Sequence, residues 1–197
     1  DTLSASGSIW GTVDLPIVAE GVLVGISLDE DELDFGDVSI GQSNVLSVNV
    51  SNNGVGTMAA SISASNHQYT VIPDFIEIGT DSTTEILVTF APDTAGVTDA
   101  LLTFLSNDPI SPEVTVDLTG VGKTDIEGEI SGIWSPGNNP YHMIGNVNIP
   151  NDSTLTILPG VEVIFDDYYD FRVYGSLFAN GTEEDNIKFS GRGHFNY

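Results

Sequence analysis

Alternation of apolar and polar residues across residues 25–122 is the feature that most constrains the fold of this chain. One such run is residues 46–50, with apolar Leu46, Val48 and Val50, and residues 86–90 form another. A spacing of two places the apolar side chains of a strand on one face, which then needs a core to cover it. About seven short strands at this spacing predict an antiparallel sandwich of two sheets. Turn-forming residues separate the runs: Asn52-Asn53-Gly54, Gly79-Thr80-Asp81-Ser82, Pro92-Asp93-Thr94-Ala95-Gly96 and Asn107-Asp108-Pro109.

The same region carries an ordered set of short motifs. They are Leu33-Asp34-Phe35-Gly36-Asp37-Val38, Ile40-Gly41, Val48-Asn49-Val50-Ser51-Asn52-Asn53-Gly54, Val88-Thr89-Phe90-Ala91-Pro92, Ala95-Gly96, Ser106-Asn107-Asp108-Pro109 and Leu118-Thr119-Gly120. This order resembles the ASH-type immunoglobulin-like domains, relatives of the major sperm protein fold, whose bacterial members are often catalogued as choice-of-anchor domains. The resemblance implies an Ig-like sandwich that serves as a spacer or binding module in a large secreted or surface protein, and it implies no catalytic residue.

Charge is distributed very unevenly along the chain. The 197 residues include 29 acids and 4 Lys or Arg, for a formal net charge of −25, and every base follows Gly122. Such a surface repels nucleic acid and anionic lipid and suits an extracellular setting. No apolar run is long enough to span a membrane. We therefore expect neither nucleic-acid binding nor membrane insertion. The lack of cysteine excludes disulfides, thiolate metal sites and cysteine nucleophiles.

The pattern changes after residue 122. Three strand-like triplets, residues 155–157, 171–173 and 187–189, recur at a separation of sixteen, with Pro159-Gly160, Gly175 and Gly181 between them. Evenly spaced short strands with corner glycines predict a short parallel β-solenoid. The segment also looks like the first coils of the right-handed β-helix regions of secreted bacterial proteins. We thus expect an all-β chain of three parts: an extended N-terminal segment (1–24), the Ig-like sandwich (25–122) and a solenoid-like segment (123–197), with the boundary at Val121-Gly122-Lys123-Thr124.

A short motif occurs in both the first and the last of these parts. Ile9-Trp10, Pro16 and Gly21 recur as Ile133-Trp134, Pro140 and Gly145 with a common offset of 124. Either the match is chance or one supersecondary unit is used twice. The second interpretation predicts that residues 1–24 of one copy dock as a strand on the open coils of another, with Trp10, Pro16, Gly21, Trp134, Pro140 and Gly145 at the contact. Such a head-to-tail contact propagates into a filament unless it closes a ring. Further coils in a longer parent protein are the simpler alternative.

Carboxylates supply the few candidate sites. Asp166, Asp167 and Asp170 stand at a predicted coil corner beside two tyrosines, where we favour a solvated turn over a calcium site or sugar contact. The run Asp29-Glu30-Asp31-Glu32 with Asp34 does not fit an EF-hand and is expected to be a solvated strand edge. His67, His142 and His194 lack the spacing of a zinc site. No nucleophile-elbow or phosphate-loop motif is present.

Two functions remain after these exclusions. The first is a non-catalytic structural or adhesive protein, extracellular or on the cell surface, with no cofactor other than possible Ca²⁺. Its partner would be itself, in a head-to-tail filament, or a cell-surface polysaccharide. The second is the front end of a carbohydrate-active β-helix enzyme, a polysaccharide lyase or hydrolase, with Glu162, Asp166, Asp167 and Asp170 as the only candidate carboxylates. So few coils offer little groove for a polymer, and we favour the first.

Overall fold

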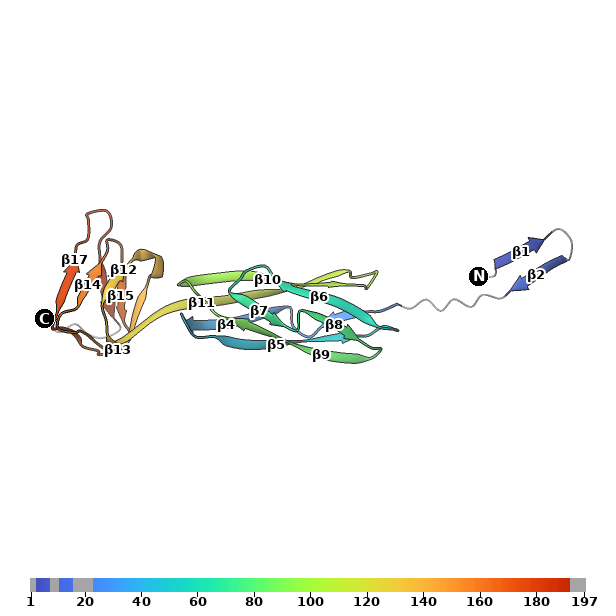
Figure 1. Cartoon of the computed structure of the whole chain (residues 1–197), viewed down its shortest axis with the longest axis horizontal. Coiled ribbons are helices and arrows are strands. Elements are labelled where there is room, and N and C mark those ends of the chain that lie inside the picture. Colours follow the sequence, from blue (N-terminus) through green and yellow to red (C-terminus); the bar gives the residue numbers. More distant parts are fainter. Residues whose placement is uncertain (1–2, 8–10, 16–22, 192–197) are drawn as a thin grey trace.

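The computed structural model describes residues 3–7, 11–15 and 23–191, which fold almost entirely as β-strands (Figure 1). Strands β1 (Leu3–Gly7) and β2 (Gly11–Leu15) form an antiparallel hairpin. A two-sheet sandwich and a set of parallel strands follow. The only helix among the described residues is a single 3₁₀ turn, η1 (Pro136–Asn138).

Two sheets make up the sandwich. One contains β3 (Ile26–Leu28), β5 (Asn44–Asn52), β9 (Ser82–Phe90) and β7 (Tyr69–Ile72), in that spatial order and all antiparallel. The other has the order β8 (Phe75–Ile78), β6 (Met58–Ala64), β10 (Gly96–Ser106) and β11 (Glu113–Glu129). Its last member, β4 (Glu32–Ser39), pairs with β11 in parallel. The sequence predicts the sandwich correctly but gives no sign of this parallel pair.

The alternating side chains fill the space between the two sheets, which confirms the period-two prediction. Val48, Ile86 and Phe90 are fully buried, as are Phe104 and Val116 on the facing sheet. Burying a side chain of this size contributes roughly 1.5–3 kcal/mol. The rings of Phe35 and Tyr69 complete the core, with ring centroids 5.4 Å apart. Tyr69 donates a hydrogen bond to the Thr98 carbonyl at 2.7 Å, and burial raises the pKa of its phenol to about 12.

Beyond the sandwich, all strand pairs are parallel. β11 pairs with β13 (Tyr141–Ile149). β13 pairs in turn with both β15 (Glu162–Phe165) and β16 (Phe171–Val173), and β15 pairs with β18 (Lys188–Gly191). A separate sheet has the order β12 (Gly132–Trp134), β14 (Thr154–Ile157) and β17 (Ser176–Ala179). The sheets enclose a second core, built from Trp134, Tyr141, Met143, Val147, Ile149, Leu155, Ile157, Val161 and Val163.

The expected spacing of sixteen residues between stacked strands is wrong. Residues 155–157 lie in β14, whereas 171–173 and 188–189 lie in β16 and β18 of the other sheet. Strands that pair side by side in one sheet are further apart in sequence. Leu155 aligns with Leu177, and Val163 aligns with Phe189. Sixteen residues therefore lead from one of these two sheets to the other.

The expected boundary at residues 121–124 lies inside a strand. β11 pairs with β4 through Lys123 and with β13 from Thr124 onward. Figure 1 shows β11 leaving the sandwich and entering the parallel sheets as one ribbon. The two parts therefore share a strand, and no loop separates them.

The N-terminal part does not repeat the β12–β13 arrangement within the described residues. Strands β1 and β2 pair with each other, whereas β12 pairs with β14 and β13 with β11. Residues 11–15 correspond to 135–139, which form no strand. Trp10, Pro16 and Gly21 lie outside the described residues, so the predicted head-to-tail contact stays a prediction.

Candidate functional site

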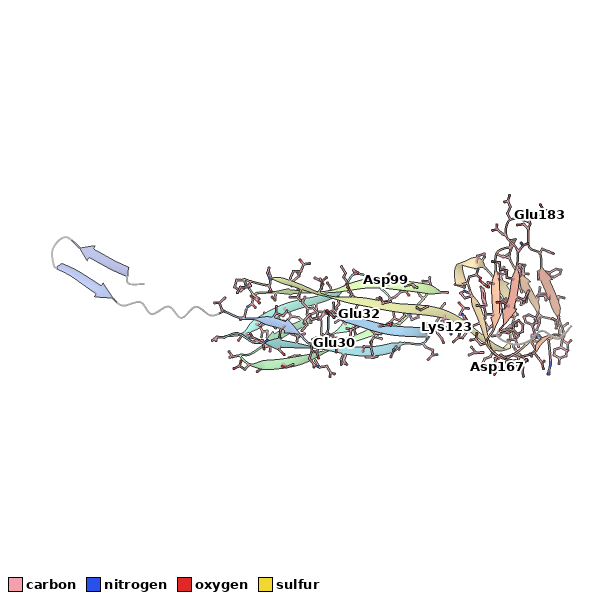
Figure 2. The ribbon with its side chains drawn as sticks, turned by 180° about the vertical axis from the view of Figure 1, so that it is seen from behind. Glu30, Glu32, Asp99, Lys123, Asp167 and Glu183 are labelled. Carbon is pink, nitrogen blue, oxygen red and sulfur yellow. The ribbon has the colours of Figure 1, made fainter. Side chains whose placement is uncertain are left out.

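The joint between the sandwich and the parallel sheets contains a cleft of about 410 Å³. Lys123 Nζ lies 3.6 Å from Asp37 Oδ2, and His142 Nδ1 lies 3.0 Å from Asp166 Oδ1. Figure 2 shows Lys123 at the point where the sandwich meets the parallel sheets. The lining residues are Asp37, Gly96, Val121, Gly122, Lys123, Pro140, His142 and Asp166.

Polar pairs across this joint connect neighbouring strands. Ser39 on β4 donates a hydrogen bond to Asp125 Oδ2 on β11, while Asp125 Oδ1 is buried without a partner. His142 on β13 is in register with Asp125. A catalytic site needs an acid, base or nucleophile directed at an open substrate position. Here Asp37 pairs with Lys123 and His142 pairs with Asp166, so the arrangement supports a structural joint better than a reaction.

The three candidate calcium ligands have separate partners. Asp166 bonds to His142, Asp170 Oδ2 lies 2.5 Å from Arg172 Nη2, and Asp167 Oδ1 accepts a hydrogen bond from the Tyr168 N–H at 2.8 Å. The Asp170 contact raises the pKa of the Arg172 guanidinium. Within residues 3–7, 11–15 and 23–191, no group of three or more His, Cys, Asp or Glu side chains is placed to hold a metal ion.

The acidic run before β4 holds two strands together. Both carboxylate oxygens of Asp29 accept hydrogen bonds from Asn49, one from its backbone N–H and one from Nδ2, each at 2.7 Å. These bonds lower the pKa of Asp29. A shallow hollow of about 380 Å³ lies beside this turn, next to Val114 and Thr115. Glu32 of β4 and Asp117 of β11 stand opposite each other in register, so this face repels anions.

The histidines and the remaining candidate carboxylate do not gather into a site. His67 Nε2 lies 2.8 Å from Asp93 Oδ2 on the surface of the sandwich, and this contact lowers the pKa of Asp93. His194 lies outside the described residues. Glu162 lies on β15 in register with Lys188, and its backbone N–H donates to Asn139 Oδ1 at 2.9 Å.

The three C-terminal assembly candidates have structural roles. Trp134 stacks on Tyr141 with ring centroids 4.7 Å apart, and the Tyr141 hydroxyl bonds to Ser135. Pro140 lines the cleft at the joint. A Cβ atom on Gly145 would lie 2.9 Å from Glu127 Oε2, so this glycine leaves room for the Glu127 side chain of β11.

Strands β16 and β18 carry apolar side chains that are largely exposed. The sequence predicts an open end of the parallel strands but does not identify these residues. Val163 and Ile149 are fully buried, whereas their in-register neighbours Phe189 and Val173 are 44% and 47% exposed. Aligned residues of parallel strands point to the same side of the sheet. Phe189 and Val173 therefore point toward the interior of the stack, and no further strand covers them in the described residues. Only the pairing register, which the sequence does not give, identifies them as interior positions.

Comparison with known families agrees with the sandwich. The family model described as "HYDIN/CFA65/VesB-like, Ig-like domain" matches residues 25–121. The sandwich is an Ig-like domain. No curated protein matches the chain at a significant level. Within the described residues, no helix has the length and apolar character needed to cross a membrane.

Solved structures with similar folds cover about half of the chain. The ASH/PapD-like domain of human CEP192 (PapD-like domain 7) is 11% identical, with a TM-score of 0.46 over 60% of this chain and 97% of that domain. A protein from Porphyromonas gingivalis W83 is 18% identical, with a TM-score of 0.46 over 56% of this chain and 57% of its own. SSP-19, an MSP-domain protein like family member in Caenorhabditis elegans, is 13% identical, with a TM-score of 0.38 over 48% of this chain and 98% of its own.

Proposed function

We propose that this protein is a non-catalytic structural or adhesive module of the cell surface or extracellular space. In this proposal the Ig-like domain is an ASH-type spacer, and the parallel sheets are the first coils of a β-solenoid. One observation carries the proposal: β11 is a single strand of 17 residues that belongs to both parts.

A shared strand makes a stiff joint. Lys123 marks the joint, and its carbonyl accepts a hydrogen bond from the Ile40 N–H at 2.8 Å. Just beyond it, Thr124 Oγ1 donates to the Asn138 carbonyl at 2.8 Å. Domains joined by an exposed linker move relative to each other by default. Backbone pairing on both sides of the joint opposes such motion, which suits a module that holds its neighbour in a fixed direction.

Stacking in the parallel sheets supports the solenoid part of the proposal. Thr124, Tyr141, Val163 and Phe189 align on successive strands of one sheet, and Gly132, Leu155 and Leu177 align on the other. Repeated alignment at the same position is how coil proteins build a continuous core. The net charge of −25 supports an exposed, solvated location, because it keeps copies soluble.

The non-catalytic role is tested with polysaccharides. The full chain is incubated with acidic and neutral polysaccharides, with and without Ca²⁺, and reducing ends and unsaturated products are measured. We expect no product under any condition. Release of either product would contradict the proposal and favour a carbohydrate-active enzyme.

The surface location is tested on intact cells of the source organism. We expect an antibody against the Ig-like domain to label these cells without permeabilisation, and added protease to remove the signal. Labelling that requires permeabilisation would place the protein inside the cell and contradict this part of the proposal.

A further inference from the structure

The two outer faces of the sandwich differ in charge. The outer face of β3, β5, β9 and β7 carries one exposed acid, Glu85. The outer face of the other sheet, up to Gly122, carries seven, which are Glu32, Asp34, Asp37, Glu77, Asp99, Glu113 and Asp117. Acids that served only to keep copies of the protein apart would have no reason to gather on one face.

Strand pairing brings these carboxylates close together. Asp99 aligns through Thr119 with Asp34, and Asp117 aligns directly with Glu32. Like charges directly opposite each other destabilise a sheet, and a positively charged partner offsets this repulsion. The acidic face is defined hereafter by the five exposed carboxylates of β4, β10 and β11 that lie on this side and outside the joint: Glu32, Asp34, Asp99, Glu113 and Asp117.

The chain itself supplies no positive charge to the acidic face. None of the ion pairs among residues 3–7, 11–15 and 23–191 includes one of its five carboxylates. The N-terminal segment 1–24 contains acids and no Lys or Arg, so it would add repulsion. A second copy offers little more, because Lys123 already pairs with Asp37 and Arg172 with Asp170. Charge complementarity therefore indicates a different, basic molecule.

Exposed apolar side chains run beside the carboxylates along β10. Val97, Leu101 and Leu105 are 68%, 44% and 52% exposed, and they lie on the same side of the strand as Asp99. Leu105 aligns through Ser61 with Phe75 of β8, which is also exposed. A free cation would leave this apolar stripe in water, whereas a polypeptide with apolar side chains covers it, which is favourable. The stripe therefore indicates a protein partner.

The hollow of about 380 Å³ beside the turn before β4 borders the acidic face at Thr115. Leu28 and Val114 give it partly buried apolar walls. Lys and Arg side chains bury an apolar stem and keep the charged end at the surface, so apolar walls under an acidic rim fit one long basic side chain. Figure 2 shows Glu30 of this rim on the sandwich together with Glu32 and Asp99 of the acidic face. The rim residues are Asp29, Glu30 and Asp31.

We propose that the acidic face and the adjoining hollow form a docking surface for a basic segment of another protein, in which Lys or Arg residues alternate with apolar ones. One long basic side chain enters the hollow, and further basic side chains lie along Glu32, Asp34 and Asp117. The apolar side chains of the segment cover Leu101 and Leu105. This inference adds a partner to the proposed structural role and does not depend on it.

Three synthetic peptides test the proposal on the full chain. The first repeats the sequence Lys-Leu-Lys-Ser, the second replaces each Leu with Ser at the same charge, and the third replaces each Lys with Glu. Isothermal titration calorimetry in about 0.1 M NaCl measures the affinity of each peptide. We expect one copy of the first peptide to bind per chain, the second to bind several-fold more weakly because it cannot cover the apolar stripe, and the third not to bind.

A pair of variants with equal net charge locates the contact. The triple variant Glu32→Gln, Asp34→Asn, Asp117→Asn removes three carboxylates from the acidic face. Its control, Glu85→Gln, Glu183→Gln, Glu184→Gln, removes three exposed carboxylates from the other face of the sandwich and from the parallel sheets. We expect the affinity for the first peptide to fall about tenfold in the first variant and by less than about threefold in the control.

A second pair of variants tests the hollow. Thr115→Arg supplies the hollow with a basic side chain of its own, whereas Thr70→Arg places the same side chain on exposed β7 of the other face. We expect the affinity for the first peptide to fall about tenfold in Thr115→Arg and to change by less than about threefold in Thr70→Arg. Near-UV circular dichroism verifies that each variant is folded, and the triple variant decides the result if Thr115→Arg is not.

Three results would overturn the proposal. The first is no binding of the Lys-Leu-Lys-Ser peptide, and the second is equal affinity for the peptides with and without Leu. The third is an equal loss of affinity in the two triple variants, which would mean that the peptide responds only to the net charge of the chain. Polysaccharide products bear on the proposed function alone and leave these results unchanged.

Discussion

A Cβ atom on Gly122 would lie 2.1 Å from the carbonyl oxygen of Thr94, so β11 passes the loop before β10 with no space for a side chain. This oxygen is a backbone atom of the loop, so no change of side-chain rotamer relieves the contact. We expect Gly122→Ala to destabilise the protein by about 2–4 kcal/mol, because β11 or the loop must shift. Denaturant unfolding measures the change.

Gly79→Ala is the matched control for this substitution. Its Cβ would meet nothing closer than Ser82 Oγ at 3.9 Å, which is ordinary contact. We expect an effect within about 0.5 kcal/mol there. An equal loss of unfolding free energy in Gly122→Ala and Gly79→Ala would show that the close approach of Gly122 to Thr94 does not limit stability.

Asn52 is a buried polar residue at one end of the sandwich. Its side chain is fully buried, and Nδ2 donates to the carbonyls of Gly56 and Ile78 at 2.8 and 3.1 Å. Its Oδ1 accepts from the N–H groups of Gly25 and Gly54 at 3.1 and 3.0 Å. Asn52→Leu leaves all four backbone groups without this partner, so we expect a loss of about 3 kcal/mol or more in the free energy of unfolding.

The adjacent Asn53 provides the comparison. It lies on the surface, and its side chain donates one hydrogen bond to Ser27 Oγ at 2.7 Å. Asn53→Leu should cost less than about 1 kcal/mol. Thermal and denaturant unfolding measure both variants. A similar loss of unfolding free energy in Asn52→Leu and Asn53→Leu would refute a special role for Asn52.

Asp108 links the loop after β10 to the first strand of the sandwich. Its carboxylate accepts hydrogen bonds from the Ile110 N–H at 2.8 Å and from the Ile26 N–H at 3.1 Å, and these bonds lower its pKa. The pKa of such a carboxyl group is about 3.9 in the unfolded chain. Because its pKa is lower in the folded state, the group stabilises the fold at pH values above about 3.9. This stability is lost as the pH falls through the lower, folded pKa.

Asp108→Asn should therefore destabilise the protein at neutral pH, and the difference from the unmodified chain should shrink below about pH 4. Melting temperatures between neutral and acidic pH measure this difference. Glu77→Gln, which removes one charge from the exposed part of β8, controls for net charge. A difference that stays constant down to the most acidic pH would contradict the role of the ionised carboxylate.

Local pattern is sufficient to predict the sandwich but not its polar centres. Val48 and Ile86 are identified as core residues by alternation alone, because a buried face requires that period. The sequence predicts that Asn52 and Asp108 are turn residues, but Asn52 is the last residue of β5, whereas Asp108 does lie in the loop after β10. Their burial depends on Gly25, Ile26 and Ile78, which are distant in sequence, so no local signal reveals it.

Stacking in the parallel sheets is harder still to predict. The strands are short, and the segments between them vary in length, so equal spacing in sequence does not mean equal position in the two sheets. Phe189 stacks on Val163, not on Phe171, although Phe171 lies nearer the expected period. The continuous β11 is likewise hidden, because Gly120 and Gly122 resemble a linker until the pairing with β4 is known.

The last prediction concerns fragments that end on either side of the joint. The fragment 25–122 contains every buried hydrophobic residue of the Ig-like core except Val24. It ends before Lys123, whose carbonyl accepts a hydrogen bond from the Ile40 N–H and whose ammonium lies near Asp37. The fragment 25–126 keeps both contacts and the bond from Ser39 to Asp125. We expect both to unfold cooperatively, with 25–126 more stable by about 1–2 kcal/mol, since it retains one backbone and one charged hydrogen bond. Equal stability would mean that the joint does not brace β4, and a fragment 25–122 without near-UV circular dichroism would mean that the Ig-like domain needs the parallel sheets to fold.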